Sequence, residues 1–160
     1  SSKLISNGKI VGWYQGKMEW GPRSLGNRSI LADPREAKMK DVLNEKIKHR
    51  ESFRPFAPSI LEEHTTDYFV IDIPSPYMLM VTSVKQPDKI PAFTHVDGTA
   101  RVQLVKKNCG SIIRSILEEW FEQTGCPMLL NTSLNIKGKP IVNTWDDAEE
   151  FSKKYNVNVF

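Results

Sequence analysis

Basic side chains in this chain lie in loops where glycine or proline constrains the backbone. The first such loop, 19–28, carries Arg23 between Gly21 and Gly26. Glycine lets the backbone approach a ligand closely, and a planar guanidinium offers paired donors to phosphate oxygens. A glycine-rich turn with a solvated arginine would explain the same residues, so this loop alone does not establish a binding site.

A second basic segment contains Lys48, Arg50 and Arg54 and runs into a stretch with prolines at 55 and 58. Cations near a helix C-terminus also interact favourably with the helix dipole, which is a purely structural reason for finding them there. The prolines would nevertheless hold these cations on a stiff support. If all three side chains point the same way, they form a receptor for a phosphorylated substrate.

A third candidate is the turn at Asp97-Gly98, with His95 before it and Arg101 after it. The chain has three histidines and no second metal ligand at a familiar spacing from His95, which favours a hydrogen-bonded structural role for this residue. Arg101 leaves the turn at the start of a predicted strand. It is the better candidate for contact with an anion.

The fourth candidate is the polar segment that contains Asn131, Ser133 and Asn135 and follows a short apolar strand, 127–130. Ligands of open α/β sheets lie outside the carboxyl ends of strands, and short polar side chains there can donate to phosphate or ribose oxygens. Asx-turns use the same residue types, so a purely structural interpretation stays open. No segment matches a Walker loop or a Rossmann glycine pattern.

Composition describes an ordinary globular chain of 160 residues, with 39% hydrophobic and 26% charged residues. Its formal net charge of +3 suits an anionic ligand but is too small to indicate nucleic acid. Cys109 and Cys126 have no metal-binding spacing and no obvious histidine partner, so we expect reduced, buried or half-buried thiols rather than a disulfide or a nucleophile. No apolar run could span a membrane and no signal peptide is visible, which makes the cytoplasm the expected location.

Helical and strand patterns are interspersed, which predicts one α/β or α+β domain with a mixed sheet. The helix after Asp33-Pro34 should use Asp33 as its N-cap. Helices are also expected at 62–69, from 112 to a stop at Gly125, and from an N-cap at Thr144. Strands are expected at 9–14, 28–31, 59–61, 77–81, 92–96, 100–105, 127–130 and the C-terminal residues 156–160.

The sequence around these loops resembles the C-terminal domain of the O-carbamoyltransferases, which include enzymes that modify nodulation factors and antibiotics. The resembling blocks are GKIVGWYQGKMEWGPRSLGNRSILADPR, KIKHRESFRPFAPSILEE, PAFTHVDGTARVQ and TGCPMLLNTSLNIKGKPIVNT. Trp20, Ser24 and Leu134 depart from the commoner Phe, Ala and Phe. The resemblance implies a YrdC-like fold, an open twisted mixed sheet flanked by helices. The signatures K-x-R and S-x-N of that fold match 48–50 and 133–135.

The same resemblance implies that the domain, residues 1–160, converts carbamoyl phosphate and ATP into carbamoyl adenylate with the help of Mg²⁺. An N-terminal transferase domain of actin-like fold, expected to be missing from this fragment, would pass the carbamoyl group to a hydroxyl acceptor. The residues that the resemblance assigns to catalysis are Lys48, Arg54, Arg101 and Asn131, and those assigned to binding are Arg23, Arg50, Ser133 and Asn135. No protein ligand for a metal is assigned.

Two alternative functions keep the same fold. A threonylcarbamoyl-adenylate synthase would use threonine, bicarbonate and ATP, and the K-x-R and S-x-N residues cannot exclude it. The GPRSLGNRS and FRPFAPS blocks favour carbamoyl phosphate instead. A non-catalytic RNA-binding module is a third hypothesis, but the weak net charge and the lack of aromatic stacking platforms argue against it.

Overall fold

The computed structural model describes residues 2–160, so Ser1 of the expected domain lies outside the described residues. The helices are α1 (Ser2–Ser6), α2 (Ala37–Val42), the π-helix η1 (Leu43–Lys48), the 3₁₀ helices η2 (Glu62–His64) and η3 (Pro87–Lys89), α3 (Thr65–Tyr68), α4 (Ile112–Thr124) and α5 (Trp145–Tyr155). The strands are β1 (Val11–Tyr14), β2 (Arg28–Ala32), β3 (Ala57–Leu61), β4 (Phe69–Val70), β5 (Val81–Val84), β6 (Thr99–Arg101), β7 (Gln103–Val105), β8 (Met128–Ser133) and β9 (Asn158–Val159).

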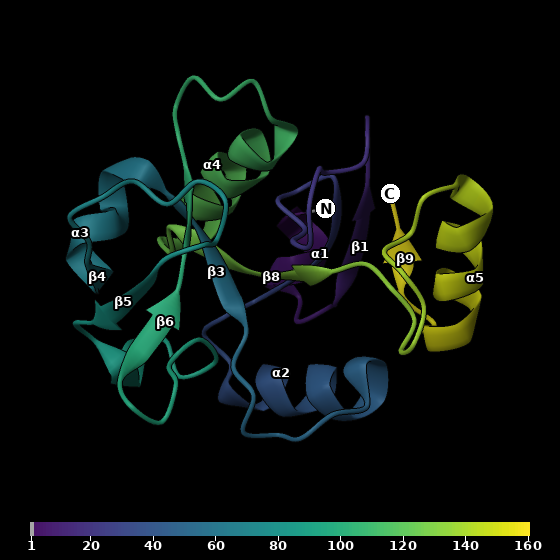
Figure 1. Cartoon of the computed structure of the whole chain (residues 1–160), viewed down its shortest axis with the longest axis horizontal. Coiled ribbons are helices and arrows are strands. Elements are labelled where there is room, and N and C mark those ends of the chain that lie inside the picture. The colour runs from purple at the N-terminus through teal and green to yellow at the C-terminus, as the bar shows by residue number, and fades with distance from the viewer. Residues whose placement is uncertain (1) are drawn as a thin grey trace.

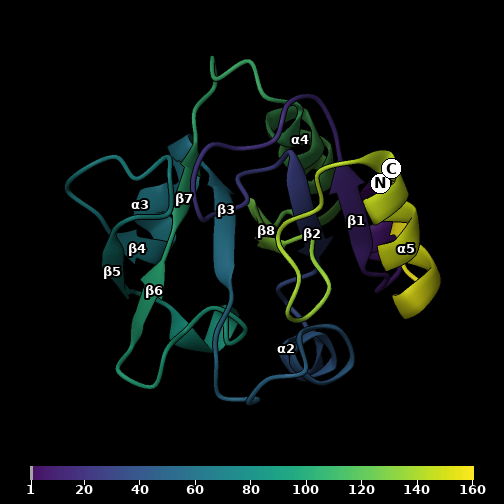
Figure 2. The same cartoon turned by 45° about the vertical axis from the view of Figure 1, so that its right-hand side comes forward.

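A six-stranded mixed sheet in the order β7-β3-β8-β2-β1-β9 forms the centre of the fold, and β4-β5-β6 form a smaller sheet beside it. Both sheets can be followed in Figures 1 and 2, with α2 below the strands and α5 beside β9. Most neighbouring strands of the large sheet are antiparallel, whereas β3–β7 and β1–β9 are parallel. The expected mixed α/β architecture is therefore confirmed.

Apolar faces explain how the helices attach to the sheet. Ile113, Leu117 and Trp120 of α4 are almost fully buried, and α4 contacts β3, β8 and α1. Burial of each such side chain stabilises the fold by about 1.5–3 kcal/mol. The expected end of α4 is confirmed, because Gly125 follows it in the left-handed conformation with φ 69°.

The start of α5 is also confirmed. Thr144 and Asp147 form a capping box, in which each side chain accepts a hydrogen bond from the other residue's backbone N–H. The C-terminal strand appears as β9, which pairs with β1. The short helix α1 was not anticipated from the sequence.

The expected N-cap of α2 is wrong. The helix begins at Ala37, and its N-cap is Glu36. Asp33 instead accepts hydrogen bonds from the backbone N–H and the guanidinium of Arg35, so its carboxylate is engaged before the helix starts. Asp33 and Pro34 therefore belong to a turn before the helix and do not cap it.

Three strand predictions are wrong, two of them in part and one entirely. Residues 77–80 are not a strand, because Met78 adopts a left-handed φ of 54° and its apolar neighbours face solvent. Residues 92–96 are not a strand either, and turns that begin at Ile90 bury Ala92 and Phe93. The strand expected at 100–105 is divided between the two sheets, as β6 and β7.

Two further differences concern the polar segment and the cysteines. β8 continues to Ser133, so Asn131 and Ser133 lie on a strand rather than in a loop. Cys126 is buried and Cys109 is exposed, which corrects the expectation that both are covered, and both are free thiols. Among the described residues no helix is long and apolar enough to cross a membrane.

Candidate functional site

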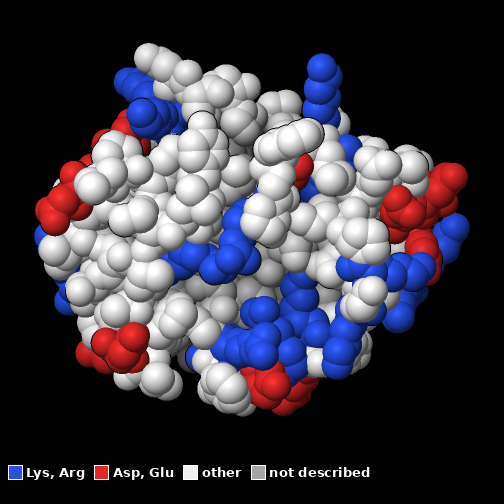
Figure 3. Space-filling view, viewed as in Figure 1, with Lys and Arg blue, Asp and Glu red and all other residues white. Residues whose placement is uncertain are grey.

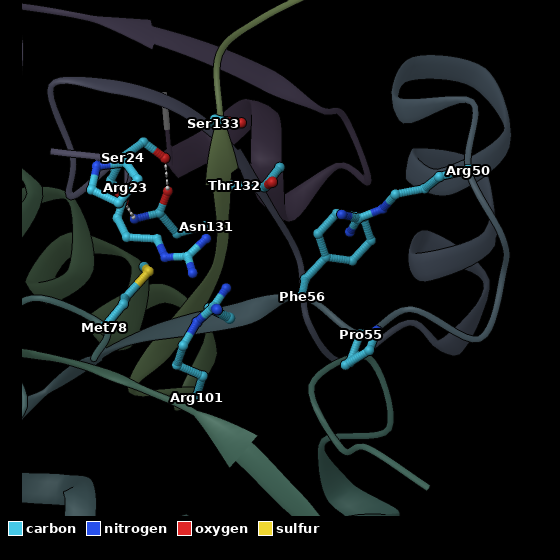
Figure 4. Close-up of a pocket in the computed structure, with 12 residues that line it drawn as sticks. Arg23, Ser24, Arg50, Pro55, Phe56, Met78, Arg101, Asn131, Thr132 and Ser133 are labelled. Carbon is cyan, nitrogen blue, oxygen red and sulfur yellow. Dashed lines mark hydrogen bonds between the residues drawn. The ribbon is translucent and has the colours of Figure 1, made fainter. Parts of the chain in front are cut away.

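A pocket of about 130 Å³ opens where the 22–24 loop, the end of β6 and the end of β8 meet (Figure 4). Its lining consists of Pro22, Arg23, Ser24, Arg50, Pro55, Phe56, Ala57, Met78, Arg101, Asn131, Thr132 and Ser133. Three of these residues are arginines and none is acidic. Figure 3 shows basic surface around the centre and lower middle of this face. The pocket therefore concentrates positive charge without an internal counter-ion.

Glu19 organises the loop that carries Arg23. Its Oε1 accepts hydrogen bonds from the backbone N–H groups of Leu25, Asn27 and Arg28 at 2.8, 2.6 and 3.2 Å. Gly26 has a φ of 116°, and a Cβ there would lie 2.7 Å from Ile113 Cβ, so only glycine fits this approach to α4. Sequence reasoning missed the role of Glu19, although a carboxylate at the start of a glycine-rich loop could have indicated it.

Arg28, the second arginine of this loop, does not face the pocket. It is buried, its guanidinium lies 3.6 Å from the centre of the Tyr14 ring, and it donates to the carbonyl oxygens of Gln15, Gly16 and Asn27. The ring contact and the carbonyl acceptors hold the two terminal nitrogens of this buried arginine without an acid, while its buried Nε has no hydrogen-bond partner among the described residues. This side chain supports the loop.

Arg23 and Arg101 turn toward one another beside Asn131 (Figure 4). Burial and then the charge of Arg23 lower the pKa of Arg101. Arg50 approaches from the other side, where its guanidinium lies 4.6 Å from the centre of the Phe56 ring. Burial and then Arg54 lower its pKa as well. Burial is the larger cause of both shifts, and the neighbouring cations add to it.

Asn131 is 1% exposed and belongs to a buried hydrogen-bond network. Its Nδ2 donates to Ser59 Oγ at 2.9 Å, Gln103 Oε1 at 3.1 Å and the backbone oxygen of Ser24 at 3.3 Å. Ser24 Oγ donates to Asn131 Oδ1 at 3.4 Å. The amide therefore joins the 22–24 loop to the sheet at the wall of the pocket.

Lys48 lies just behind the pocket wall, at the end of η1. Its Nζ donates to the backbone oxygen of Ser133 at 2.6 Å, to Ser133 Oγ at 3.1 Å and to Asn135 Oδ1 at 2.8 Å. Burial and then the charge of Arg50 lower the pKa of Lys48 to about 7. His49 follows in the left-handed conformation with φ 47°, which turns the chain between Lys48 and Arg50.

The structure thus brings five expected site residues into one pocket: Arg23, Arg50, Arg101, Asn131 and Ser133. Lys48 and Asn135 adjoin it through their contacts with Ser133. Arg54 is not among the lining residues, because its half-exposed guanidinium forms an ion pair with Glu51 at 2.9 Å. His95 does not line the pocket either, and its backbone closes the turn before β6.

The described residues contain no group of three His, Cys, Asp or Glu side chains that could hold a metal ion. Mg²⁺ prefers carboxylate oxygens together with water or substrate phosphates. The protein groups near the pocket therefore do not fit a Mg²⁺ site of their own.

Two solved structures are similar to this chain in fold. P. abyssi Sua5 complexed with L-threonine matches 99% of this chain and 44% of its own, with a TM-score of 0.66 and 17% identity. Full-length HypF in its phosphate- and nucleotide-bound form matches 96% of this chain and 19% of its own, with a TM-score of 0.62 and 20% identity. The fold is the YrdC-like fold expected from the sequence.

The family model for the carbamoyltransferase C-terminus matches residues 2–160, and the chain belongs to this family. The nodulation protein NolNO of Sinorhizobium fredii is 44% identical over 92% of this chain, which corresponds to 22% of the relative. The 3'-hydroxymethylcephem-O-carbamoyltransferase of Amycolatopsis lactamdurans is 42% identical over 98% of this chain, or 30% of the relative. The chain spans less than a third of the length of these relatives.

Proposed function

We propose that this chain binds carbamoyl phosphate and ATP and forms carbamoyl adenylate for transfer to a hydroxyl acceptor by another domain. The observation that carries the proposal is the gathering of Arg23, Arg50 and Arg101 in one pocket that no acidic side chain lines. Holding like charges together costs free energy unless an anion joins them, so this arrangement favours a phosphorylated ligand.

Membership of the carbamoyltransferase family supports the choice of substrate. The family includes a relative whose name specifies O-carbamoyl transfer, and the related fold of HypF was solved with phosphate and a nucleotide bound. Because this chain corresponds to 22–30% of the two relatives described above, the acceptor and the final transfer step belong to the longer proteins. An N-terminal actin-like domain is our proposal for the partner that completes the reaction.

The proposed formation of carbamoyl adenylate has two steps, in which the residues of the pocket have distinct roles. Water cleaves the phosphorus–oxygen bond of carbamoyl phosphate and gives carbamate and phosphate. A carbamate oxygen then attacks the α-phosphorus of ATP, the bond to the bridging oxygen breaks, and pyrophosphate leaves with the electron pair. Arg23, Arg50 and Arg101 would bind the phosphate oxygens and neutralise the charge that grows on the leaving group.

The remaining residues of the site would position the substrates. Ser133 Oγ and the Asn131 amide lie where they could orient a small carbamoyl group, while Lys48 and Asn135 hold the end of β8 behind them. Arg54 could join the site only by leaving Glu51. Mg²⁺ would have to arrive with the phosphates of ATP, which it would neutralise while bound to them.

The decisive experiment measures exchange of labelled pyrophosphate into ATP by the purified chain. We expect exchange that depends on carbamoyl phosphate and that disappears in Arg101→Ala. The competing function is favoured by the likeness to Sua5, which was solved with L-threonine. Exchange that requires threonine with bicarbonate, and not carbamoyl phosphate, would replace our proposal with that alternative. A folded chain that binds neither ATP nor pyrophosphate would contradict both.

A further inference from the structure

Gln103 lies at the junction of the pocket, the large sheet and the loop that carries Arg23. β6 ends at Arg101 in the small sheet, and β7 begins two residues later at Gln103 as the edge of the large sheet. Gln103 is 5% exposed, and it lies behind the pocket without lining it. Buried carboxamide groups are normally hydrogen-bonded, so the hydrogen-bond partners of Gln103 indicate its structural role.

Both the nitrogen and the oxygen of this carboxamide form hydrogen bonds. Gln103 Nε2 donates to the backbone oxygen of Leu25 at 2.8 Å. Its Oε1 accepts from Ser59 Oγ at 2.5 Å and from Asn131 Nδ2 at 3.1 Å. One side chain therefore ties the segment that follows Arg23 to β3 and β8. Through its own backbone it also fixes the segment that begins at Arg101.

The two arginines that this connection joins repel each other. The charge of Arg23 lowers the pKa of Arg101, and no acidic residue lines the pocket between them. The Glu19 carboxylate holds the later part of the Arg23 loop, and the segment from Ser24 to Leu25 is held to β7 and β8 by the neutral hydrogen bonds of Gln103 and Asn131. Without them, repulsion would favour positions of Arg23 further from Arg101.

We infer that Gln103 is a positioning residue that holds Arg23 beside Arg101 before the phosphorylated ligand arrives. This inference rests on the proposed function, because it takes the arginine pocket as the binding site. It predicts that Gln103 contributes to affinity through Arg23 and not through Arg50. Arg50 is held separately, since its Nε donates to Asn44 Oδ1 at 2.7 Å.

The test is a pair of double-mutant cycles with pyrophosphate as the probe, read by calorimetry. Gln103→Met keeps the approximate volume and removes every hydrogen bond, and should weaken binding about tenfold, as expected for a lost positioning contact. In the Arg23→Ala background the same change should have less than a twofold effect. In the Arg50→Ala background it should again cost about tenfold.

Gln86→Met is the matched control, because Gln86 Nε2 also donates to a backbone oxygen at 2.8 Å, that of Asp67, outside the pocket. It should leave affinity unchanged. Gln103→Asn is the second variant if Gln103→Met does not fold, because its neutral carboxamide adds no charge but is too short to keep the hydrogen bond to the Leu25 backbone oxygen. It should give the same pattern across the two backgrounds.

Three outcomes would overturn the inference. An unchanged affinity in folded Gln103→Met would show that the contact is dispensable. Equal losses in the Arg23→Ala and Arg50→Ala backgrounds would show general support of the fold instead of positioning of Arg23. Failure of the wild-type chain to bind pyrophosphate would contradict the proposed function itself. This outcome is distinguishable from failure of the inference, because it is seen in the wild type before any variant is measured.

Discussion

Two regions of this molecule use buried or half-buried arginine in opposite ways. Arg114 of α4 is 6% exposed, and its guanidinium contacts both oxygens of Glu63, one oxygen of Glu118 and the backbone oxygen of Val105. The pKa of Arg114 is raised, first by the hydrogen bonds that it donates to Glu63. Arg114 also holds the pKa of Glu63 at about 2.

The arginines of the pocket show the reverse. The pKa values of Arg50 and Arg101 are lowered by burial and by neighbouring cations. Neutralised charge on α4 contributes to the fold, whereas charge left without a counter-ion is available to a ligand. The difference between the two regions lies in the carboxylate partners that Arg114 has and that are missing from the lining of the pocket.

The largest expected effect is on binding. Arg101→Ala should lower the affinity for pyrophosphate by about 2–3 kcal/mol, because a charge-assisted contact to the ligand is lost. Its stability toward urea should stay the same or rise, since repulsion with Arg23 is removed. Calorimetry and urea unfolding measure the two quantities. If Arg101→Ala loses stability but keeps its affinity for pyrophosphate, Arg101 supports the fold as Arg114 does and does not bind the ligand.

The opposite pattern is expected for Arg114→Ala. Removing this side chain leaves Glu63 and Glu118 without their partner, and both are about half exposed. The free energy of unfolding should fall by about 2 kcal/mol, below the range for fully buried pairs because water screens the remaining charges. Affinity for pyrophosphate should not change. A loss of affinity in a fully folded sample would argue that α4 contributes to the site.

A pH titration sharpens the comparison at Lys48, whose pKa is lowered to about 7. The ammonium is charged below that pH, so affinity for sulfate should fall severalfold between pH 6 and 9. Sulfate is the probe because it does not titrate in this range. An unfolded lysine keeps its proton up to about pH 10.4, so this group makes stability rise with pH between about 7 and 10.

Lys48→Met should abolish both of these pH dependences. Lys46→Met, on the same helix but at an exposed position, is the control. Affinity and stability profiles that stay flat in the wild type would show that Lys48 keeps its proton throughout.

The smallest effect is expected for Arg54→Ala. Its ion pair with Glu51 is half exposed on both sides, and such pairs contribute about 0–1 kcal/mol to stability. Affinity should fall less than in Arg101→Ala, because Arg54 does not line the pocket. A loss as large as that of Arg101→Ala would show that Arg54 leaves Glu51 when the ligand binds.

Local signals in the sequence were sufficient for several parts of the fold. Gly125 and Thr144 act within a few residues of themselves, so the end of α4 and the start of α5 were predictable. The apolar segment 77–81 was not, because whether its side chains face a core depends on packing that no local pattern records. Asp33 failed as a cap for a similar reason, since Arg35 competes for its carboxylate.

The same distinction applies to the site. Arg23, Arg50 and Arg101 could be nominated from residue type and loop context, and the structure places them together. Gln103 could not, because its partners Leu25, Ser59 and Asn131 are far apart in the sequence and meet only when β7, β3 and β8 align. Arg54 could be nominated from its spacing, but its pairing with Glu51 is a detail of loop geometry.

The wide turn of η1 takes up one residue more than an α-helical turn would. His49 N donates to the oxygen of Asn44, five residues earlier, as in a π-helix. Because the extra residue is absorbed within the turn, deleting one residue before Lys48 would restore ordinary α-helical winding and keep the two sides of the turn aligned. Relatives with one residue fewer in this turn should therefore still direct their lysine amino group toward the end of β8.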